Sequence, residues 1–143
     1  MKERTDMRVI FAVVALVITA APAAAVDFSQ PILDDEGKPI CTLRGDELKA
    51  GEECPTDKVF TLGFAARAAL YSNFADEQNI SGEERAKRGD LARDIRAATA
   101  RGDFKLKVED LALIKKLIGK AYGPMVVSGA WRLLDPPAEK GSK

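Results

Sequence analysis

The sequence predicts a small α+β protein in which a disulfide-closed, β-hairpin-like cap at residues 26–62 precedes a bundle of about four helices at residues 63–135. Three observations support this fold class. An apolar leader occupies residues 1–25, two cysteines lie in the segment that follows, and the remainder contains stretches with helical spacing of apolar residues. Residues 26–135 are expected to form one domain, followed by a flexible tail at residues 136–143.

The leader has the layout of a secretory signal peptide. Basic residues precede an uncharged run at residues 9–26, and Pro22 and several alanines follow its most apolar part. An Ala-x-Ala sequence ends at Ala25, so we expect cleavage between Ala25 and Val26, a periplasmic or secreted protein, and no membrane segment afterwards. The alternative is a membrane anchor retained at residues 9–26, although a span usually needs about 20 apolar residues.

The segment at residues 26–62 is expected to be rich in β structure. Apolar runs at residues 31–33 and 38–43 flank an acidic turn that ends in Gly37, which is typical of a hairpin. Residues 58–62 alternate weakly and could return as a third strand. Prolines in the two runs cannot donate to a ladder, so these strands should be irregular or lie at an edge.

Cys41 and Cys54 are the two cysteines of the chain. In an exported protein, an even number of cysteines at short spacing predicts a disulfide. Closing this loop should contribute about 3 kcal/mol in the chain-entropy model. The spacing is not that of a C-x-x-C redox motif, and two thiolates alone make a poor metal site. We therefore expect a structural Cys41–Cys54 bond around an acidic loop.

The first helix is expected from Thr61 or Gly63 to about Phe74. Its apolar residues recur at helical spacing, and its alanine content suggests close packing against a neighbouring helix. These residues are Phe64, Ala65, Ala68, Ala69 and Leu70.

The second helix should begin at a capping box in which Ser81 and Glu84 satisfy free backbone N–H groups reciprocally. It should end near Arg101, with Gly102 in the C-terminal cap. Its apolar stripe is narrow and consists of Leu91, Ile95 and Ala98.

The last two helices are predicted after a short extended segment at residues 104–108. One runs to about Ala121, and acidic residues in its first turn suit the helix dipole. Gly123 and Pro124 then end it and begin the next helix, which continues to about Leu134. The apolar face of the first of these helices consists of Leu111, Ile114, Leu117, Ile118 and Ala121.

Composition excludes several chemistries. The chain has no histidine, so Ser-His-Asp sites, Cys-His sites and ordinary zinc sites are excluded. Residues 1–25 hold three basic and two acidic side chains, so the mature chain has 19 basic and 20 acidic side chains. This balance argues against nucleic acid as a partner. We expect no catalytic site, no cofactor and no metal site.

Local patterns that suggest binding each have a simpler interpretation. The last two helices resemble the outline of a helix-turn-helix, but the second is almost entirely apolar and cannot read DNA. Residues 77–88 resemble a calcium loop, but Arg88 stands where the bidentate Glu is needed. Asn79 begins a glycosylation sequon, which matters only in a eukaryotic secretory pathway. Trp131 is predicted to be a core anchor together with Tyr122, and its alternative role is contact with a partner.

The sequence from Asp76 to Glu84 and that from Glu109 to Pro124 resemble small uncharacterised proteins encoded by tailed phages and prophages. An Asp-Phe-Ser start like that at residues 27–29 also occurs in those proteins. The resemblance extends over most of residues 27–134 and implies no activity or catalytic residues. The leader and the Cys41–Cys54 insert depart from that pattern. These departures indicate a prophage-derived domain adapted to export or a leader created by the choice of start site.

The sequence therefore favours an exported, non-enzymatic protein that acts through contact with an unknown protein partner. The alternative is a prophage-derived accessory protein that acts in virion assembly or host takeover. A carboxylate-dependent hydrolase is a third possibility, but no pair of carboxylates stands at a spacing that demands it.

Overall fold

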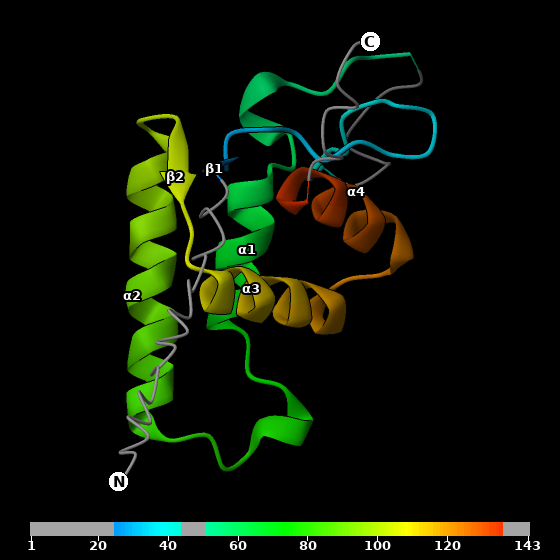
Figure 1. The fold of residues 1–143 in the computed structure, drawn as a ribbon. Coiled ribbons are helices and arrows are strands. Elements are labelled where there is room, and N and C mark those ends of the chain that lie inside the picture. Colours follow the sequence, from blue (N-terminus) through cyan, green and yellow to red (C-terminus); the bar gives the residue numbers. More distant parts are fainter. Residues whose placement is uncertain (1–24, 44–50, 136–143) are drawn as a thin grey trace, which may run out of the picture.

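The computed structural model describes residues 25–43 and 51–135 (Figure 1). The predicted signal peptide up to residue 24, the alternative anchor for most of its length, and the tail at residues 136–143 lie outside the described residues. Within the part of the chain that is described, no helix is both long and apolar enough to cross a membrane.

Within residues 25–43 and 51–135, four helices form the bundle, and each lies close to its predicted position. They are α1 (Leu62–Tyr71), α2 (Gly82–Thr99), α3 (Val108–Ala121) and α4 (Pro124–Leu134). Helices α1 and α2 lie side by side and antiparallel, α3 crosses α1, and α4 packs beside α3 (Figure 1). Short 3-10 turns, η1 (Thr56–Lys58) and η2 (Ala75–Glu77), precede α1 and α2. The predicted α+β fold class is confirmed.

Both ends of α2 have the predicted capping residues, but one predicted hydrogen bond of the capping box is not formed. The Ser81 hydroxyl accepts a hydrogen bond from the backbone N–H of Glu84 at 3.1 Å, and Gly102 adopts a positive φ of 108° beyond the last turn. The Glu84 carboxylate, however, accepts from the Arg88 guanidinium at 3.0 Å. The reciprocal half of the capping box is therefore replaced by an ion pair.

A two-stranded antiparallel sheet joins the segment before the cap to the segment between α2 and α3. Strand β1 (Ala25–Asp27) pairs with β2 (Asp103–Lys105), and Val26 lies opposite Phe104. The sequence predicted an extended segment near Phe104 but not its partner. After β1, the Asp27 carboxylate accepts from the backbone N–H of Ser29 at 2.9 Å. This turn directs the fully buried ring of Phe28 into the core.

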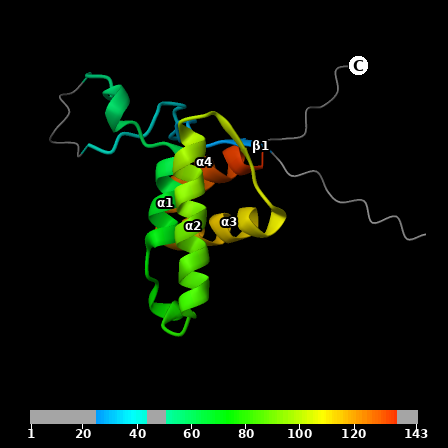
Figure 2. The same cartoon turned by 90° about the vertical axis from the view of Figure 1, so that its left-hand side faces the viewer.

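The predicted hairpin forms as a series of isolated bridges. Gly37 has a φ of 80° in the acidic turn, and residues 33 and 39 bridge on either side of it. Three backbone hydrogen bonds connect the segments. The N–H of Ile32 donates to the carbonyl of Phe60 at 2.9 Å, that of Ile40 to Ile32 at 2.9 Å, and that of Phe60 to Ile40 at 2.7 Å. The returning segment before α1 thus joins the hairpin, as predicted. The part that carries the disulfide projects beyond the helices (Figure 2).

The core lies where β1, the bridged cap segments and all four helices meet. Its largest fully buried side chains come from β1, from the cap segments and from each of the four helices. They are Val26, Phe28, Ile32, Leu62, Ile95, Ile114, Leu117, Ile118 and Leu134. The predicted apolar stripe of α2 and the central part of the predicted face of α3 are buried.

Candidate interaction surface

Helix α1 is buried over most of its circumference and exposes one aromatic face. Phe64 is 46% exposed and Tyr71 is 60% exposed, whereas Leu62 and Ala66 on the other side are fully buried. Seven residues correspond to two helical turns, so the two rings lie on one side, about 10 Å apart along the axis. The sequence predicted the helix but not that Phe64 faces solvent.

Phe64 is the outer member of a row of three aromatic rings. The centroids of Phe60 and Phe64 are 5.3 Å apart, and those of Phe60 and Tyr122 are 5.6 Å apart, both pairs edge to face. Such pairs are favourable beyond the area that they bury. The row borders a shallow, mainly apolar depression of about 380 Å³, which Ile40 and Val126 help to line. This surface offers a partner several rigid aromatic contacts.

Two local features hold α1 in this orientation. The Thr61 hydroxyl caps the helix by accepting from the backbone N–H of Phe64 at 3.3 Å. One residue before Phe64, Gly63 allows a close approach to Phe28, which follows β1, and to α2. A Cβ at Gly63 would lie only 2.9 Å from the Phe28 carbonyl oxygen and 2.8 Å from the Thr99 hydroxyl. Any side chain at this position would therefore force the start of α1 outward.

An ion-pair cluster with a buried centre lies at the C-terminal end of α1, where the loop between α1 and α2 meets α2 and α3. Arg88 donates to Glu77 at 2.8 Å and to Glu84 at 3.0 Å. Lys120 of α3 donates to Glu77 at 3.1 Å and to Asp76 at 2.6 Å. The side chains of Arg88 and Glu77 are only 4% and 8% exposed. The cluster thus ties the loop to both α2 and α3.

The pKa of Glu77 is lowered to about 2, mainly by the hydrogen bond from Arg88 and to a lesser extent by Lys120, against the opposing effect of burial. Glu77 is therefore ionised and paired at neutral pH, and it cannot serve as a proton donor or acceptor in that range. Arg88 is also the residue that breaks the calcium-loop pattern of residues 77–88. Among the described residues, no group of three acidic or cysteine side chains is placed to hold a metal ion.

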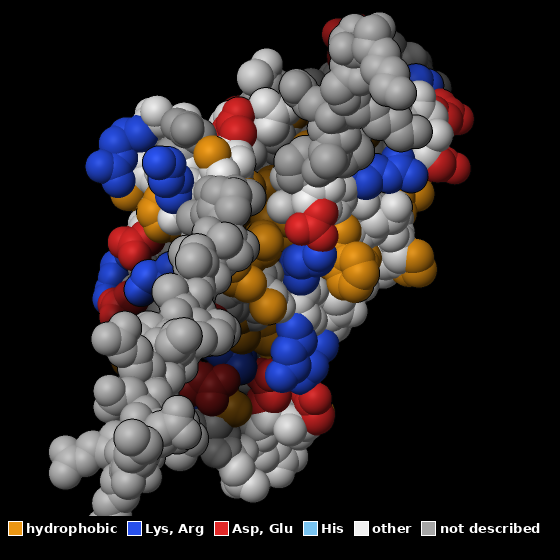
Figure 3. All heavy atoms as spheres, viewed as in Figure 1, with side chains coloured by type: hydrophobic (Ala, Val, Ile, Leu, Met, Phe, Trp, Pro, Cys, Tyr) orange, Lys and Arg blue, Asp and Glu red, His pale blue; other side chains and the backbone are white. Residues whose placement is uncertain are grey.

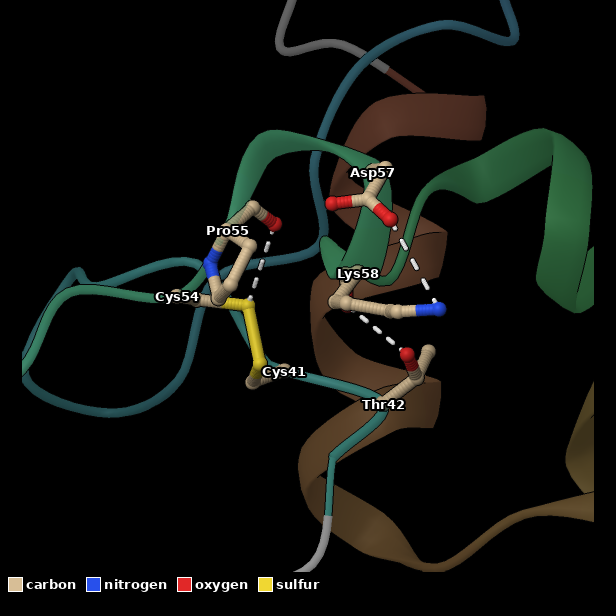
Figure 4. Close-up of a disulfide and its surroundings, with 6 residues drawn as sticks. All are labelled: Cys41, Thr42, Cys54, Pro55, Asp57 and Lys58. Atoms are coloured by element: carbon tan, nitrogen blue, oxygen red, sulfur yellow. Dashed lines mark hydrogen bonds and ion pairs between the residues drawn. A yellow bond between two sulfur atoms is a disulfide. The ribbon is translucent and has the colours of Figure 1, made fainter. Parts of the chain in front are cut away.

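Cys41 and Cys54 form the predicted disulfide, and their Cα atoms are 5.7 Å apart. The base of the loop that they close is held independently by the backbone (Figure 4). The hydroxyl and the backbone N–H of Thr42 both donate to the carbonyl of Lys58, at 2.9 and 2.8 Å. The disulfide therefore reinforces a connection that hydrogen bonds already make.

Trp131 is not the core anchor that the sequence predicted, because its side chain is 43% exposed. It lies on the flank of α4 toward α3, where the Lys115 ammonium is 5.2 Å from the ring centroid. Lys115 also pairs with Asp135. On this side of the molecule, charged side chains interrupt the hydrophobic surface over α3 and α4 (Figure 3). Trp131 stays a candidate contact residue, although Lys115 lies over its ring.

The predicted cleavage bond between Ala25 and Val26 lies inside β1. Val26 is 1% exposed, so the residue expected to become the new N-terminus is packed in the core. The structure therefore does not bring the predicted site residues together. The cleavage bond, the disulfide and Trp131 lie on β1, on the cap and on α4, respectively.

Comparison of the chain with protein-family models, with curated proteins and with solved structures found no match.

Proposed function

We propose that this chain is an exported, non-enzymatic protein that acts by binding another protein through the aromatic face of α1. The observation that carries the proposal is the exposure of Phe64 and Tyr71 on a helix that is otherwise buried. Aromatic side chains dominate the energetically important positions of protein interfaces, because each one removes about 150–250 Å² from water when it is covered.

The disulfide supports the export part of the proposal. A Cys41–Cys54 bond is typical of oxidising compartments and uncommon in the cytosol. The leader points to the same location. A phage accessory protein that worked in the cytosol would instead carry two free thiols and an uncleaved N-terminus. Thiol titration of protein from its native source separates the two roles.

Site-specific photocrosslinking in the native cell tests the binding role. A photoreactive phenylalanine analogue would replace Tyr71 in one variant and Glu83, an exposed residue on the far flank of α2, in the control variant. We expect a discrete protein adduct at position 71 and none at position 83. A second variant that also carries Phe64→Ser should lose the adduct while keeping its circular dichroism spectrum. Equal adducts at positions 71 and 83, or none at position 71, would refute the proposal.

A further inference from the structure

We propose that the exposed face shared by α1 and α2 binds an amphipathic helix of a partner protein whose apolar stripe is flanked by acidic residues. This inference rests on the proposed binding function and adds the chemistry of the partner. It follows from the spacing of the exposed apolar residues and from arginines beside them that form no ion pair with any described residue.

The apolar part of the face has the spacing of a helix ridge. Phe64, Ala68 and Tyr71 stand at positions i, i+4 and i+7 of α1, and Ala68 is half-buried between the two exposed rings. Residues at this spacing form one ridge along a helix, and such ridges pack into the grooves of another helix. The small side chain of Ala68 leaves room between the rings for a partner side chain.

Arginines border this ridge. Arg67 lies on α1 between the two rings, and its Nε donates to the carbonyl of Gly63 at 3.1 Å. On α2, Arg85 helps to line the same depression of about 190 Å³ as Tyr71. Arg96 follows Arg85 by eleven residues, three helical turns, and therefore lies on the same flank of α2. That flank runs on toward Thr99, which lies against Gly63 of α1.

These three arginines form no ion pair with any described residue, although α2 is rich in acidic residues. The acids of α2 are directed elsewhere. Glu84 pairs with the buried Arg88. Asp94 follows Arg85 by nine residues, which places it half a turn away around the helix. The face is therefore cationic on a chain whose formal net charge is zero.

This charge distribution selects among possible occupants. A second copy of the chain would bring its own arginines against Arg67, Arg85 and Arg96, and like charges oppose such contact. Nucleic acid would be held by few phosphate contacts, and the apolar ridge at helical spacing would have no counterpart in it. An acidic amphipathic helix can pack its apolar stripe against the ridge and pair its acidic residues with the arginines.

Selection from a peptide display library tests the partner chemistry. The library presents helices of about 18 residues, long enough to hold helical structure, with a fixed leucine stripe and Glu, Gln or Lys at each flanking position. The purified full chain is the target. We expect Glu to exceed Lys at the flanking positions by about tenfold, as a few exposed charge pairs would give. Binding should weaken as salt is raised.

Charge reversal makes the test specific to this face. In the variant with Arg85→Glu and Arg96→Glu, the preference should shift to Lys. The control variant carries Lys87→Glu and Lys107→Glu, the same change in charge at exposed positions away from this face, and should keep the preference for Glu. Circular dichroism should be unchanged in both variants.

The outcomes separate this inference from the proposed function. A protein adduct at position 71, together with selected helices that lack a preference for Glu, would overturn the acidic-helix inference and leave the binding function standing. A preference that persists in the Arg85→Glu, Arg96→Glu variant would overturn it as well. Competition by a single-stranded oligonucleotide at equal strength would assign the face to nucleic acid instead. Absence of any adduct would refute the binding function itself.

Discussion

Removing the carboxylate of Glu77 tests whether the buried ion-pair cluster holds the α1–α2 loop in place. In Glu77→Gln, Arg88 loses its most buried counterion and Lys120 loses one of its two. Breaking a buried pair by removing one partner costs about 3–5 kcal/mol. Because Glu84 still pairs with Arg88 from the other side, we expect a loss of about 3 kcal/mol in the free energy of unfolding at pH 7.

The pKa of Glu77 gives an independent magnitude and a sign. It is about 2 in the folded protein against 4.5 as the ordinary value. A carboxyl group with a lowered folded-state pKa stabilises the protein fully above its unfolded-state pKa, and it loses that contribution as the pH falls through the folded-state value. At about 1.4 kcal/mol per pH unit, this difference corresponds to about 3 kcal/mol, lost between pH 4.5 and about 2.

Urea unfolding of the wild type and of Glu77→Gln, followed by circular dichroism across this pH range, measures both quantities. The two stabilities should differ by about 3 kcal/mol at pH 7 and converge as the pH approaches 2. Glu84→Gln is the matched control, because Glu84 pairs with the same arginine but is 47% exposed, and it should cost about 1 kcal/mol or less. Equal stability of wild type and Glu77→Gln at pH 7, or a constant difference down to pH 2, would refute the reasoning.

Four further predictions concern the cap, the N-terminus, the packing of α4 and an exposed glycine of α2. Replacing Cys41 and Cys54 by serine should lower the free energy of unfolding by about 2–4 kcal/mol while the helical circular dichroism signal largely survives. Total loss of helix would contradict this. Mass spectrometry of native protein should find Val26 as the first residue, and an intact leader would rule out cleavage there. Gly129→Ala should destabilise by about 1–3 kcal/mol, because its Cβ would lie 2.6 Å from a methyl group of the cap. Gly89→Ala, with nothing within 4 Å, should gain up to about 1 kcal/mol in chemical denaturation.

The helices and the disulfide could be predicted because their signals are local. Ser81, Gly102 and Pro124 mark helix ends through backbone bonding and φ preferences that act over a few residues. The pairing of β1 with β2 was not predictable in the same way. Each strand has three residues, and the paired residues are 76 to 80 positions apart in the sequence, so no local pattern specifies their contact.

Burial was harder to predict than secondary structure. Trp131 was expected in the core as an anchor of the last two helices, but the apolar residues of α4 did not indicate which of them would meet solvent. The narrow stripe of α2 left no such ambiguity for Ile95, which is fully buried. Arg88 was missed for a different reason. A buried arginine is rare, and its place depends on Glu77 from the preceding loop.

The two aromatic residues of α1 are not placed as stability alone would favour. Burying a large apolar side chain stabilises a protein more than burying a small one. Helix α1 buries Leu62 completely, but it also buries Ala65, Ala66 and Ala69 while Phe64 stays 46% exposed and Tyr71 60% exposed. The alanines explain how α1 fits closely between its neighbours, but they do not explain why its two rings face outward. An exposed ring adds little to the stability of the domain and much to a contact with a partner. That asymmetry is the reason to assign the binding role to this face rather than to Trp131.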